Sequence, residues 1–326
     1  MTRRLITIAL AVLWAVRLDA ADQLLVPYVA DQWRQVAGDP DLGAYTTQNQ
    51  EPVDFAVWQA ADGTWQLWSC IRNAGCGGKT RLFYRWEGGR LTDADWTPKG
   101  VAMEADESLG ETVGGLQAPH VIKEDGVYYM FYGDWNNICL ARSDDGKHFE
   151  RVLRDDGTPA LFTGPYENSR DPMTLRIDDL YYCYYMGHKK DADPESAVFC
   201  RTSSDLRRWS DSVMVAGGGA ARKERNWFGS DAECPHVIRH EGLYYLFRTQ
   251  RYGETNVSAV YASSDPLGFG VDDDCYRVGT LPIAAPEIVV DDGEHYIAAL
   301  LPSLKGIRMA RLGWKPRSDA GQSPRP

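Results

Sequence analysis

The chain has 326 residues, of which 44% are hydrophobic and 25% charged, so it can bury a sizeable core and is not a disordered chain. Lys and Arg total 35 against 46 Asp and Glu, and this net charge of −11 argues against a nucleic-acid partner. Aromatic residues make up 11%, and together with 31 Gly and 17 Pro they favour short strands and tight turns over helix bundles.

The first 21 residues have the pattern of an export signal. Arg3 and Arg4 precede an uncharged, mostly apolar run over residues 5–16, and two alanines follow where cleavage is expected. The run is shorter than the about 20 residues that span a bilayer, and no second run approaches that length. We therefore expect residues 1–21 to be a signal peptide, the protein to be exported to the periplasm or secreted, and no membrane association after the signal is removed.

A strand–turn–strand pattern repeats along the rest of the chain. The copies are residues 54–68, 118–132, 171–185, 234–248 and 285–296. In the last four copies a Pro is followed seven residues later by Gly or Asp, between two runs rich in Val, Ile and aromatic residues. Such runs joined by a short polar turn are typical of β-hairpins.

A second element recurs downstream of three of these hairpins. Ser143, Ser203 and Ser263 are 60 residues apart, and each is followed by an Asp and then an aromatic residue. We interpret it as a third strand, a polar turn and the start of a fourth strand. Four strands in each of five repeats predict an all-β fold, a five-bladed β-propeller with four-stranded blades over residues 22–314. A β-sandwich, the alternative, gives no reason for this repeat. We expect residues 315–326 to be a disordered tail.

The chain has seven cysteines, an odd number, so at least one is unpaired or none forms a disulfide. Cys70 and Cys76 flank a loop-like stretch and could pair. Cys183 and Cys200 occupy repeat positions where other copies have apolar residues, so we interpret them as buried core residues.

Three carboxylates stand where the innermost strands of different blades are expected to begin. These are Asp54 and Asp171, which directly precede the repeat Pro position, and Glu233, which is separated from it by one residue. Propeller geometry brings these positions to one mouth of the central axis. One such acid would more often be a solvated turn residue, but three at matched positions favour a functional site.

Crowded carboxylates have pKa values that are pushed apart. One acid can then stay protonated while another is ionised, which is the division that glycoside hydrolysis requires. Arg170, beside Asp171, is expected to keep that carboxylate ionised or to bind sugar hydroxyls. The remaining acids of the repeats fall in turns, and we interpret them as structural. They are Asp62, Asp125, Asp178 and Asp292 in the hairpins, and Asp145, Asp205 and Asp265 in the second element.

Further candidates for substrate binding are Gln117, His120 and Trp135. His120 and His236 share one repeat position, where they either line the channel as hydrogen-bonding spacers or touch substrate. Trp135 and Trp58 could stack on a sugar ring, although Trp is more often a core residue. No histidine shows the spacing of metal ligands and no cofactor motif is present, so the sequence predicts neither a metal nor a cofactor.

The motifs around two of the acids resemble those of known glycosidases. Residues 169–172 (Ser-Arg-Asp-Pro) and 233–235 (Glu-Cys-Pro) resemble the Arg-Asp-Pro and Glu-Cys motifs of family 32 glycoside hydrolases. The order Asp, Asp, Glu over blades one, three and four is also similar to family 43 arabinosidases and xylosidases. The resemblance covers about residues 40–314. It implies that Asp54 is the nucleophile or the base, Asp171 the transition-state stabiliser and Glu233 the acid/base.

The chain also departs from both families. Residues around Asp54 lack the Asn, Pro and Gly of the family 32 motif, and no C-terminal β-sandwich follows blade five. Family 43 often has a histidine near the axis in blade five, with a bound ion or water, where this chain has Ala284-Ala285-Pro286.

The sequence therefore predicts a glycoside hydrolase that acts on an oligo- or polysaccharide, at a chain end and on a furanoside. A family-43-like inverting arabinosidase or xylosidase, a transferase and a non-catalytic carbohydrate-binding propeller are the alternatives. The presence of a carboxylate at all three positions argues against a non-catalytic binding propeller, because binding alone would tolerate Asn or Gln there. The sugar, the linkage, the stereochemical outcome and the oligomeric state stay open at this point.

Overall fold

The computed structural model describes residues 24–166, 168–189, 195–226 and 230–317. The predicted signal peptide lies outside the described residues, as does most of the predicted tail. No helix within these ranges has the length and apolar character needed to cross a membrane.

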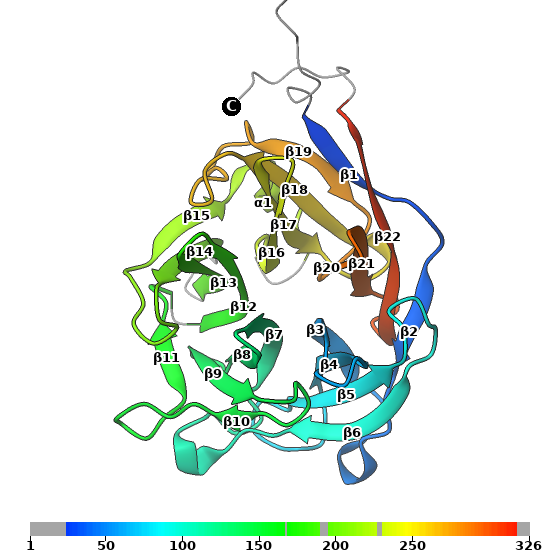
Figure 1. The fold of residues 1–326 in the computed structure, drawn as a ribbon, viewed down its shortest axis with the longest axis vertical. Coiled ribbons are helices and arrows are strands. Elements are labelled where there is room, and N and C mark those ends of the chain that lie inside the picture. Colours follow the sequence, from blue (N-terminus) through cyan, green and yellow to red (C-terminus); the bar gives the residue numbers. More distant parts are fainter. Residues whose placement is uncertain (1–23, 167, 190–194, 227–229, 318–326) are drawn as a thin grey trace, which may run out of the picture.

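Five antiparallel sheets surround a central axis, which confirms the predicted five-bladed propeller (Figure 1). Blade one contains β3 (Glu51–Gln59), β4 (Trp65–Arg72), β5 (Leu82–Gly88) and β6 (Thr97–Met103). Blade two contains β7 (Gln117–Glu124), β8 (Val127–Gly133) and β9 (Asn137–Ser143), with β10 (Glu150–Arg151) and β11 (Ala160–Thr163) both paired to β9. Blade three contains β12 (Asn168–Ile177), β13 (Leu180–Lys189), β14 (Glu195–Ser203) and β15 (Val213–Gly217). Blade four contains β16 (Glu233–His240), β17 (Leu243–Arg251), β18 (Val257–Ser263) and β19 (Arg277–Leu281).

The fifth blade joins the two ends of the described chain. It contains β20 (Glu287–Asp291), β21 (Glu294–Leu300) and β22 (Gly306–Pro316), and its outer strand is β1 (Leu25–Val29). β2 (Arg34–Gly38) pairs with the first half of β22. Figure 1 shows β1 in blue beside β22 in red, so an N-terminal strand closes the ring. β22 continues two residues beyond the predicted boundary at 314.

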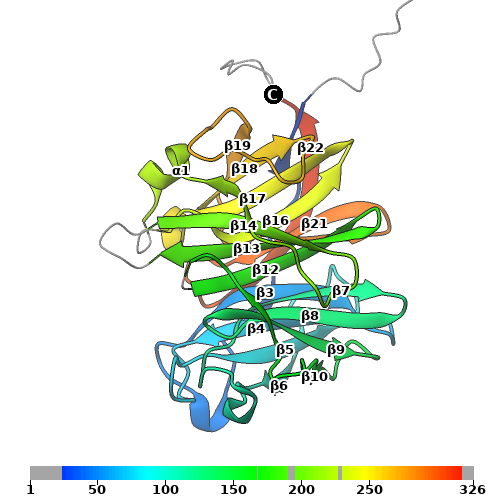
Figure 2. The same ribbon diagram turned by 90° about the vertical axis from the view of Figure 1, so that its left-hand side faces the viewer.

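Short helices occupy the connections between strands. They are α1 (Gly219–Glu224) and the 3-10 turns η2 (Gly43–Tyr45), η3 (Glu107–Leu109) and η4 (Gly253–Thr255). In the side view the long inner hairpins stack one above another around the axis (Figure 2). The innermost strands β3, β7, β12, β16 and β20 contact one another in sequence, and β20 contacts β3 again, so the ring is closed on its inner side as well.

The hairpin turns have the conformation that their residues predict. In the β7–β8 turn Asp125 and Gly126 have φ of 51° and 84°, and the β20–β21 turn residues Asp292 and Gly293 have 49° and 78°. Two successive positive φ values match the twist of the flanking strands, and Asp followed by Gly tolerates them best. The structural interpretation of these acids is therefore confirmed.

The repeated Ser–Asp element is also a turn. The Ser143 hydroxyl accepts a hydrogen bond from the Gly146 N–H at 2.8 Å, and the Asp145 carboxylate accepts from the Lys147 and His148 N–H groups at 2.7 and 2.9 Å. Asp205 accepts from two backbone N–H groups in the same way. These side chains satisfy turn amides, so their role is structural.

Trp58 packs between blades one and two. It is buried, its indole N–H donates to the Gly146 carbonyl at 2.8 Å, and its ring lies against Trp68 and Phe149 with centroids 5.9 and 5.8 Å away. Its alternative role as a sugar platform is therefore wrong, because both faces belong to the core.

All seven cysteines are free thiols. The proposed Cys70–Cys76 disulfide is absent, since Cys70 is fully buried in β4 and its thiol donates to the Leu116 carbonyl at 3.3 Å. Cys183 and Cys200 are buried among apolar side chains, as predicted.

Candidate active site

The residue before the repeat Pro has an unusual backbone in every blade. The φ values are 28° at Asp54, 42° at Ala118, 55° at Asp171, 47° at Cys234 and 50° at Ala285. The strand register shifts at this point in blades one to four, which marks a β-bulge. In four blades the next residue is Pro, which has no N–H to lose from the ladder. A non-glycine residue held in this region costs about 1–3 kcal/mol, and such strain is concentrated at functional sites.

In blades one to four the two residues at the bulge line cavities on the axis. A cavity of about 240 Å³ lies at this end of the axis, and Asp54, Gln117, Trp135, Arg170 and Glu233 all line it. Five of the seven predicted site residues are thus brought to one cavity. Further lining residues that the sequence did not single out as candidates are Val53, Arg72, Arg81, Asn168, Ser230 and Tyr252.

Asp171 lies one layer deeper than Asp54 and Glu233. It is 3% exposed, and its Oδ2 accepts a hydrogen bond from the Cys234 N–H at 3.0 Å. Together with Asp54 and Cys234 it lines a small second cavity on the axis. Asp54 borders both cavities, so all three predicted acids surround one short stretch of the axis.

Arg170 pairs with Glu233 more closely than with its chain neighbour Asp171. Its Nη2 and Nε lie 2.7 and 3.3 Å from the two carboxylate oxygens of Glu233, whereas its Nε is 4.0 Å from Asp171 Oδ1. Its Nη1 donates to the Asn168 side-chain oxygen. A guanidinium that engages both oxygens of a carboxylate fixes its orientation as well as its charge.

The acids differ in pKa as crowding requires, and the acid whose pKa is raised is Asp171. Burial, followed by repulsion from Asp54 and Glu233, raises the pKa of Asp171 well above its usual range. Burial alone would raise the pKa of Glu233, but the charge of Arg170 and its hydrogen bonds to both carboxylate oxygens lower it overall. Of the two carboxyl groups, Asp171 therefore favours the protonated form and Glu233 the ionised form.

Cys234 adds a donor to this cluster. Its thiol donates to Asp54 Oδ1 at 3.1 Å and lies 3.4 Å from the Tyr252 hydroxyl. Burial and the three neighbouring carboxylates raise the pKa of the Cys234 thiol well above its usual range. The group therefore remains a thiol at neutral pH and orients the Asp54 carboxylate.

Two histidines and a glutamate meet further along the axis. His120, His236 and Glu287 each follow the repeat Pro of their blade, and their nearest ligand atoms lie within 4.8 Å of one another. His120 is 7% exposed and does not line the larger cavity, where it was expected to touch substrate. Burial, only partly offset by Glu287, lowers the pKa of His120 to about 4, so the ring is neutral.

The hydrogen bonds of the two rings decide what they can ligate. His120 Nε2 lies 3.1 Å from the Thr174 carbonyl and donates to it, so Nδ1 keeps its lone pair. His236 Nε2 accepts from the Ile288 N–H at 3.3 Å, so its proton is on Nδ1, which faces Glu287 at 3.4 Å. His120 Nδ1 and the Glu287 carboxylate are thus ready to hold a cation, whereas His236 would first have to release Ile288.

Comparison with solved structures shows which known fold this chain has. No protein-family model matches the sequence, and no curated protein matches it. A thermostable family-43 glycoside hydrolase matches in structure with a TM-score of 0.62 and 21% identity, over 86% of this chain and 96% of that one. The fold is that of family-43 glycoside hydrolases.

Two further structures extend this likeness. The GH43_1 enzyme from Xanthomonas citri complexed with xylotriose gives a TM-score of 0.60 at 16% identity, over 89% of this chain and 96% of that one. The endo-arabinase from Bacteroides thetaiotaomicron gives 0.59 at 14% identity, over 82% and 94%. The predicted resemblance to family 43 is therefore confirmed in the fold.

Proposed function

We propose that the protein hydrolyses a glycosidic bond of an oligo- or polysaccharide. The observation that carries the proposal is that Asp54 and Glu233 line one cavity, with Asp171 buried beside them. Asp54 serves as nucleophile or as base for water, Glu233 protonates the leaving oxygen, and Asp171 stabilises the transition state. The likeness to enzymes of family 43, one of them complexed with xylotriose, supports a saccharide substrate.

The opposite pKa shifts of Asp171 and Glu233 give this mechanism its first step. Glu233 can act as a general acid only after it gains a proton, and the nearby Asp171, whose pKa is raised, is the group that supplies it. When sugar hydroxyls draw Arg170 away from Glu233, the pKa of Glu233 rises and the proton moves to it. Glu233 then gives the proton to the leaving oxygen as the glycosidic bond breaks. Where Asp54 acts as base, it takes a proton from the water that attacks the anomeric carbon. A bond to the water oxygen then forms on one side of the sugar as the bond to the leaving oxygen breaks on the other.

The size of the cavity supports action at a chain end. Its volume of about 240 Å³ is below the about 300–1,000 Å³ usual for drug-sized ligands. Such a cavity suits a terminal sugar unit rather than a long segment of a polysaccharide. A terminal furanoside is the substrate that we propose, and a terminal xyloside or an inverting arabinosidase activity is the nearest alternative.

The experiment is a screen of the purified protein on aryl furanosides and pyranosides, with natural arabinans, xylans and fructans. We expect release of a single sugar from at least one furanoside, with the anomeric outcome read by proton NMR. Inversion assigns Asp54 as base, and retention assigns it as nucleophile. Binding of these saccharides without any turnover would instead identify a carbohydrate-binding propeller.

A further inference from the structure

The cavity holds a cation that has no carboxylate partner. Of the arginines that line it, Arg170 pairs with Glu233, and Arg72 Nε lies 2.6 Å from Glu51 Oε2. Arg81 has no carboxylate within 4.0 Å in the described parts of the chain; the only side-chain hydrogen bond of its guanidinium goes to the Cys70 sulfur at 4.0 Å. The positive charge of Arg81 is therefore available to pair with an anionic group of a ligand in the cavity.

A second cation lies beside it. The Lys79 Nζ is 4.8 Å from the centre of the Trp135 ring, and the Arg81 guanidinium carbon is 5.3 Å from the same centre. No ion pair involves Lys79 within the ranges that the structure describes. The π-face of Trp attracts cations, so both charges stay close to this ring, and together they form a cationic wall. Arg81 belongs to the lining of the cavity, and Lys79 is exposed beside it. The ring of Trp135, which was predicted to stack on a sugar, therefore lines the cavity and also contacts these two cations.

The backbone beneath these cations is fixed. The Lys79 and Arg81 N–H groups donate to the Val113 and Gly114 carbonyls of the next blade, both at 2.9 Å. The blades approach so closely here that a Cβ on Gly114 would lie 2.3 Å from the Gly77 carbonyl oxygen. The cationic wall is therefore preorganised, which reduces the entropy lost when a ligand binds.

We propose that the saccharide cleaved here carries a carboxylate, a uronic acid unit that binds against Arg81 in the cavity, with Lys79 close by. The planar fork of a guanidinium matches the two oxygens of a carboxylate, and the exposed ammonium group adds a second charge near it. A neutral sugar would leave the charge of Arg81 unmatched in a partly desolvated cavity. This inference rests on the proposed hydrolysis and not on the furanoside specificity, and it adds a substrate class to the same cavity.

Calorimetric binding of paired probes tests the proposal without any need for turnover. The acidic probes are trigalacturonate and a xylotriose substituted with 4-O-methylglucuronate, and each is compared with its carboxyl-reduced form. We expect at least one acidic probe to bind about tenfold more tightly than its reduced partner at low ionic strength, with a smaller advantage at 0.5 M salt. Equal or weaker binding of both acidic probes would overturn the proposal.

Three variants test whether the preference for acidic probes comes from Arg81. Arg81→Gln should reduce the preference for the acidic probe to less than about twofold, and Arg81→Lys should restore part of it. Arg90→Gln is the matched control, because Arg90 is exposed, pairs with Asp93 and does not line the cavity. It should keep the full preference. An acid preference that survives in Arg81→Gln would also refute the proposal.

The proposals fail separately. If the acidic probe is preferred and no glycoside is cleaved under any condition, the proposed hydrolysis is wrong and the anionic site stands. If glycosides are cleaved and reduced probes bind as well as acidic ones, hydrolysis stands and the uronate is wrong.

Discussion

A single guanidinium decides how three carboxyl groups share protons at the mouth of the axis. Arg170 favours the ionised form of Glu233, and the charges of Asp54 and Glu233 disfavour ionisation of the buried Asp171. In the mechanism that we propose, a substrate that competes for Arg170 therefore raises the pKa of Glu233 directly. Substrate binding and activation of the general acid are then one event.

The first prediction concerns the acids. Glu233→Gln removes the transferable proton, so turnover of a natural substrate should fall by about 10²–10⁴, the usual contribution of general acid catalysis. Substrates with a good leaving group should lose much less, because they need little protonation. Asp54→Asn should abolish turnover of both kinds of substrate. Steady-state kinetics on a natural and an activated glycoside make the comparison.

A turn residue supplies the control for these variants. Asp178 is in the β12–β13 hairpin with φ of 51°, a conformation that Asn adopts readily. Asp178→Asn should keep full activity on both substrates. Unchanged hydrolysis of a natural substrate by Glu233→Gln would remove Glu233 from the mechanism.

The second prediction follows from the Arg170–Glu233 pair. Arg170 lowers the pKa of Glu233, so Arg170→Met should raise it. The acid must be protonated to act, and activity is lost as pH rises through its pKa. The descending alkaline limb of the kcat/KM profile should therefore move to higher pH in Arg170→Met, while the maximum falls because substrate contacts are lost. An alkaline limb that stays in place or moves to lower pH contradicts this coupling.

The acids could be predicted from sequence because they recur at two neighbouring positions of a repeat, Asp54 and Asp171 directly before the Pro position and Glu233 one residue earlier. The cationic wall could not, because Lys79 and Arg81 belong to an irregular connection between β4 and β5 with no counterpart in the other copies. Glu287 could also have been predicted, since it follows the repeat Pro as His120 and His236 do. The raised pKa of Asp171 depends on distances and burial that no sequence pattern contains.

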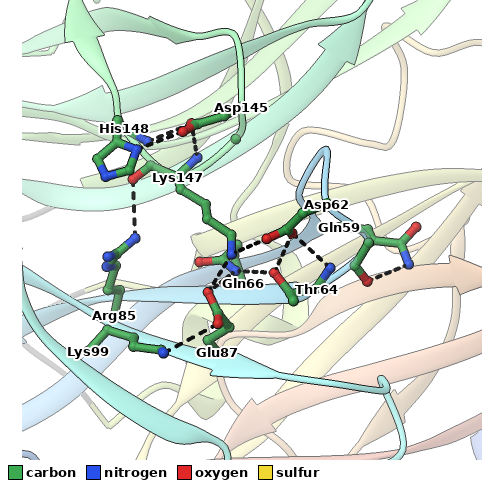
Figure 3. Close-up of polar contacts among 12 residues, drawn as sticks. Gln59, Asp62, Thr64, Gln66, Arg85, Glu87, Lys99, Asp145, Lys147 and His148 are labelled. Carbon is green, nitrogen blue, oxygen red and sulfur yellow. Dashed lines mark hydrogen bonds and ion pairs between the residues drawn. The ribbon is translucent and has the colours of Figure 1, made fainter.

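At the scale of elements, blades are joined by polar contacts as well as by apolar packing. Lys147, in the turn after β9, lies 2.6 Å from Asp62 Oδ2 in the β3–β4 hairpin and 2.7 Å from Glu87 Oε2 in β5 (Figure 3). Gln66 donates to the same Glu87 oxygen at 3.0 Å. The side chain thus ties blade two to two strands of blade one.

The third prediction is a pH dependence of this junction. The hydrogen bond to Lys147 is the largest cause that lowers the pKa of Asp62 and of Glu87, each to about 2. Carboxylates with a lowered folded-state pKa stabilise the protein above their unfolded pKa of about 4, and this contribution is lost as pH falls towards 2. Lys147→Met should therefore lower Tm by about 2–4 °C at pH 7 and by much less near pH 2–3.

A neighbouring arginine provides the comparison for that variant. Arg142 pairs with Asp144 on the surface of the same blade, and both side chains are more than half exposed. Exposed pairs of this kind contribute little, so Arg142→Met should leave Tm unchanged within about 1 °C. A Tm difference for Lys147→Met that is the same at pH 7 and pH 2.5 would show that the charges do not contribute.

Hairpins and turns were predictable because their determinants are local. Asp-Gly pairs and Ser–Asp elements specify their own backbone, whichever blade they occupy. The split of the outer strand of blade two into β10 and β11 was not foreseen, because both segments are selected by their pairing with β9.

At the scale of the molecule, the ring is closed by strands from opposite ends of the chain. Leu25 pairs with Pro316, and the register continues to Val29 opposite Leu312. Val26 and Trp314 pack against the apolar cluster between blades four and five. No local pattern encodes a pairing over this separation, so the repeat predicted five blades but not how the last is completed.

The last prediction tests this closure. Deletion through Val29 removes the outer strand of blade five, with its ladder of hydrogen bonds and its partly buried apolar side chains, and exposes the edge of β22. We expect Tm to fall by about 10 °C or more and the protein to associate, because an exposed strand edge is a template for pairing with other chains. Thermal unfolding and size-exclusion chromatography measure both effects. Deletion of residues 1–23 is the control, and it should leave Tm and size unchanged because β1 begins at Leu25. Equal stability of the two truncated chains would mean that the pairing of β1 with β22 does not hold the ring together.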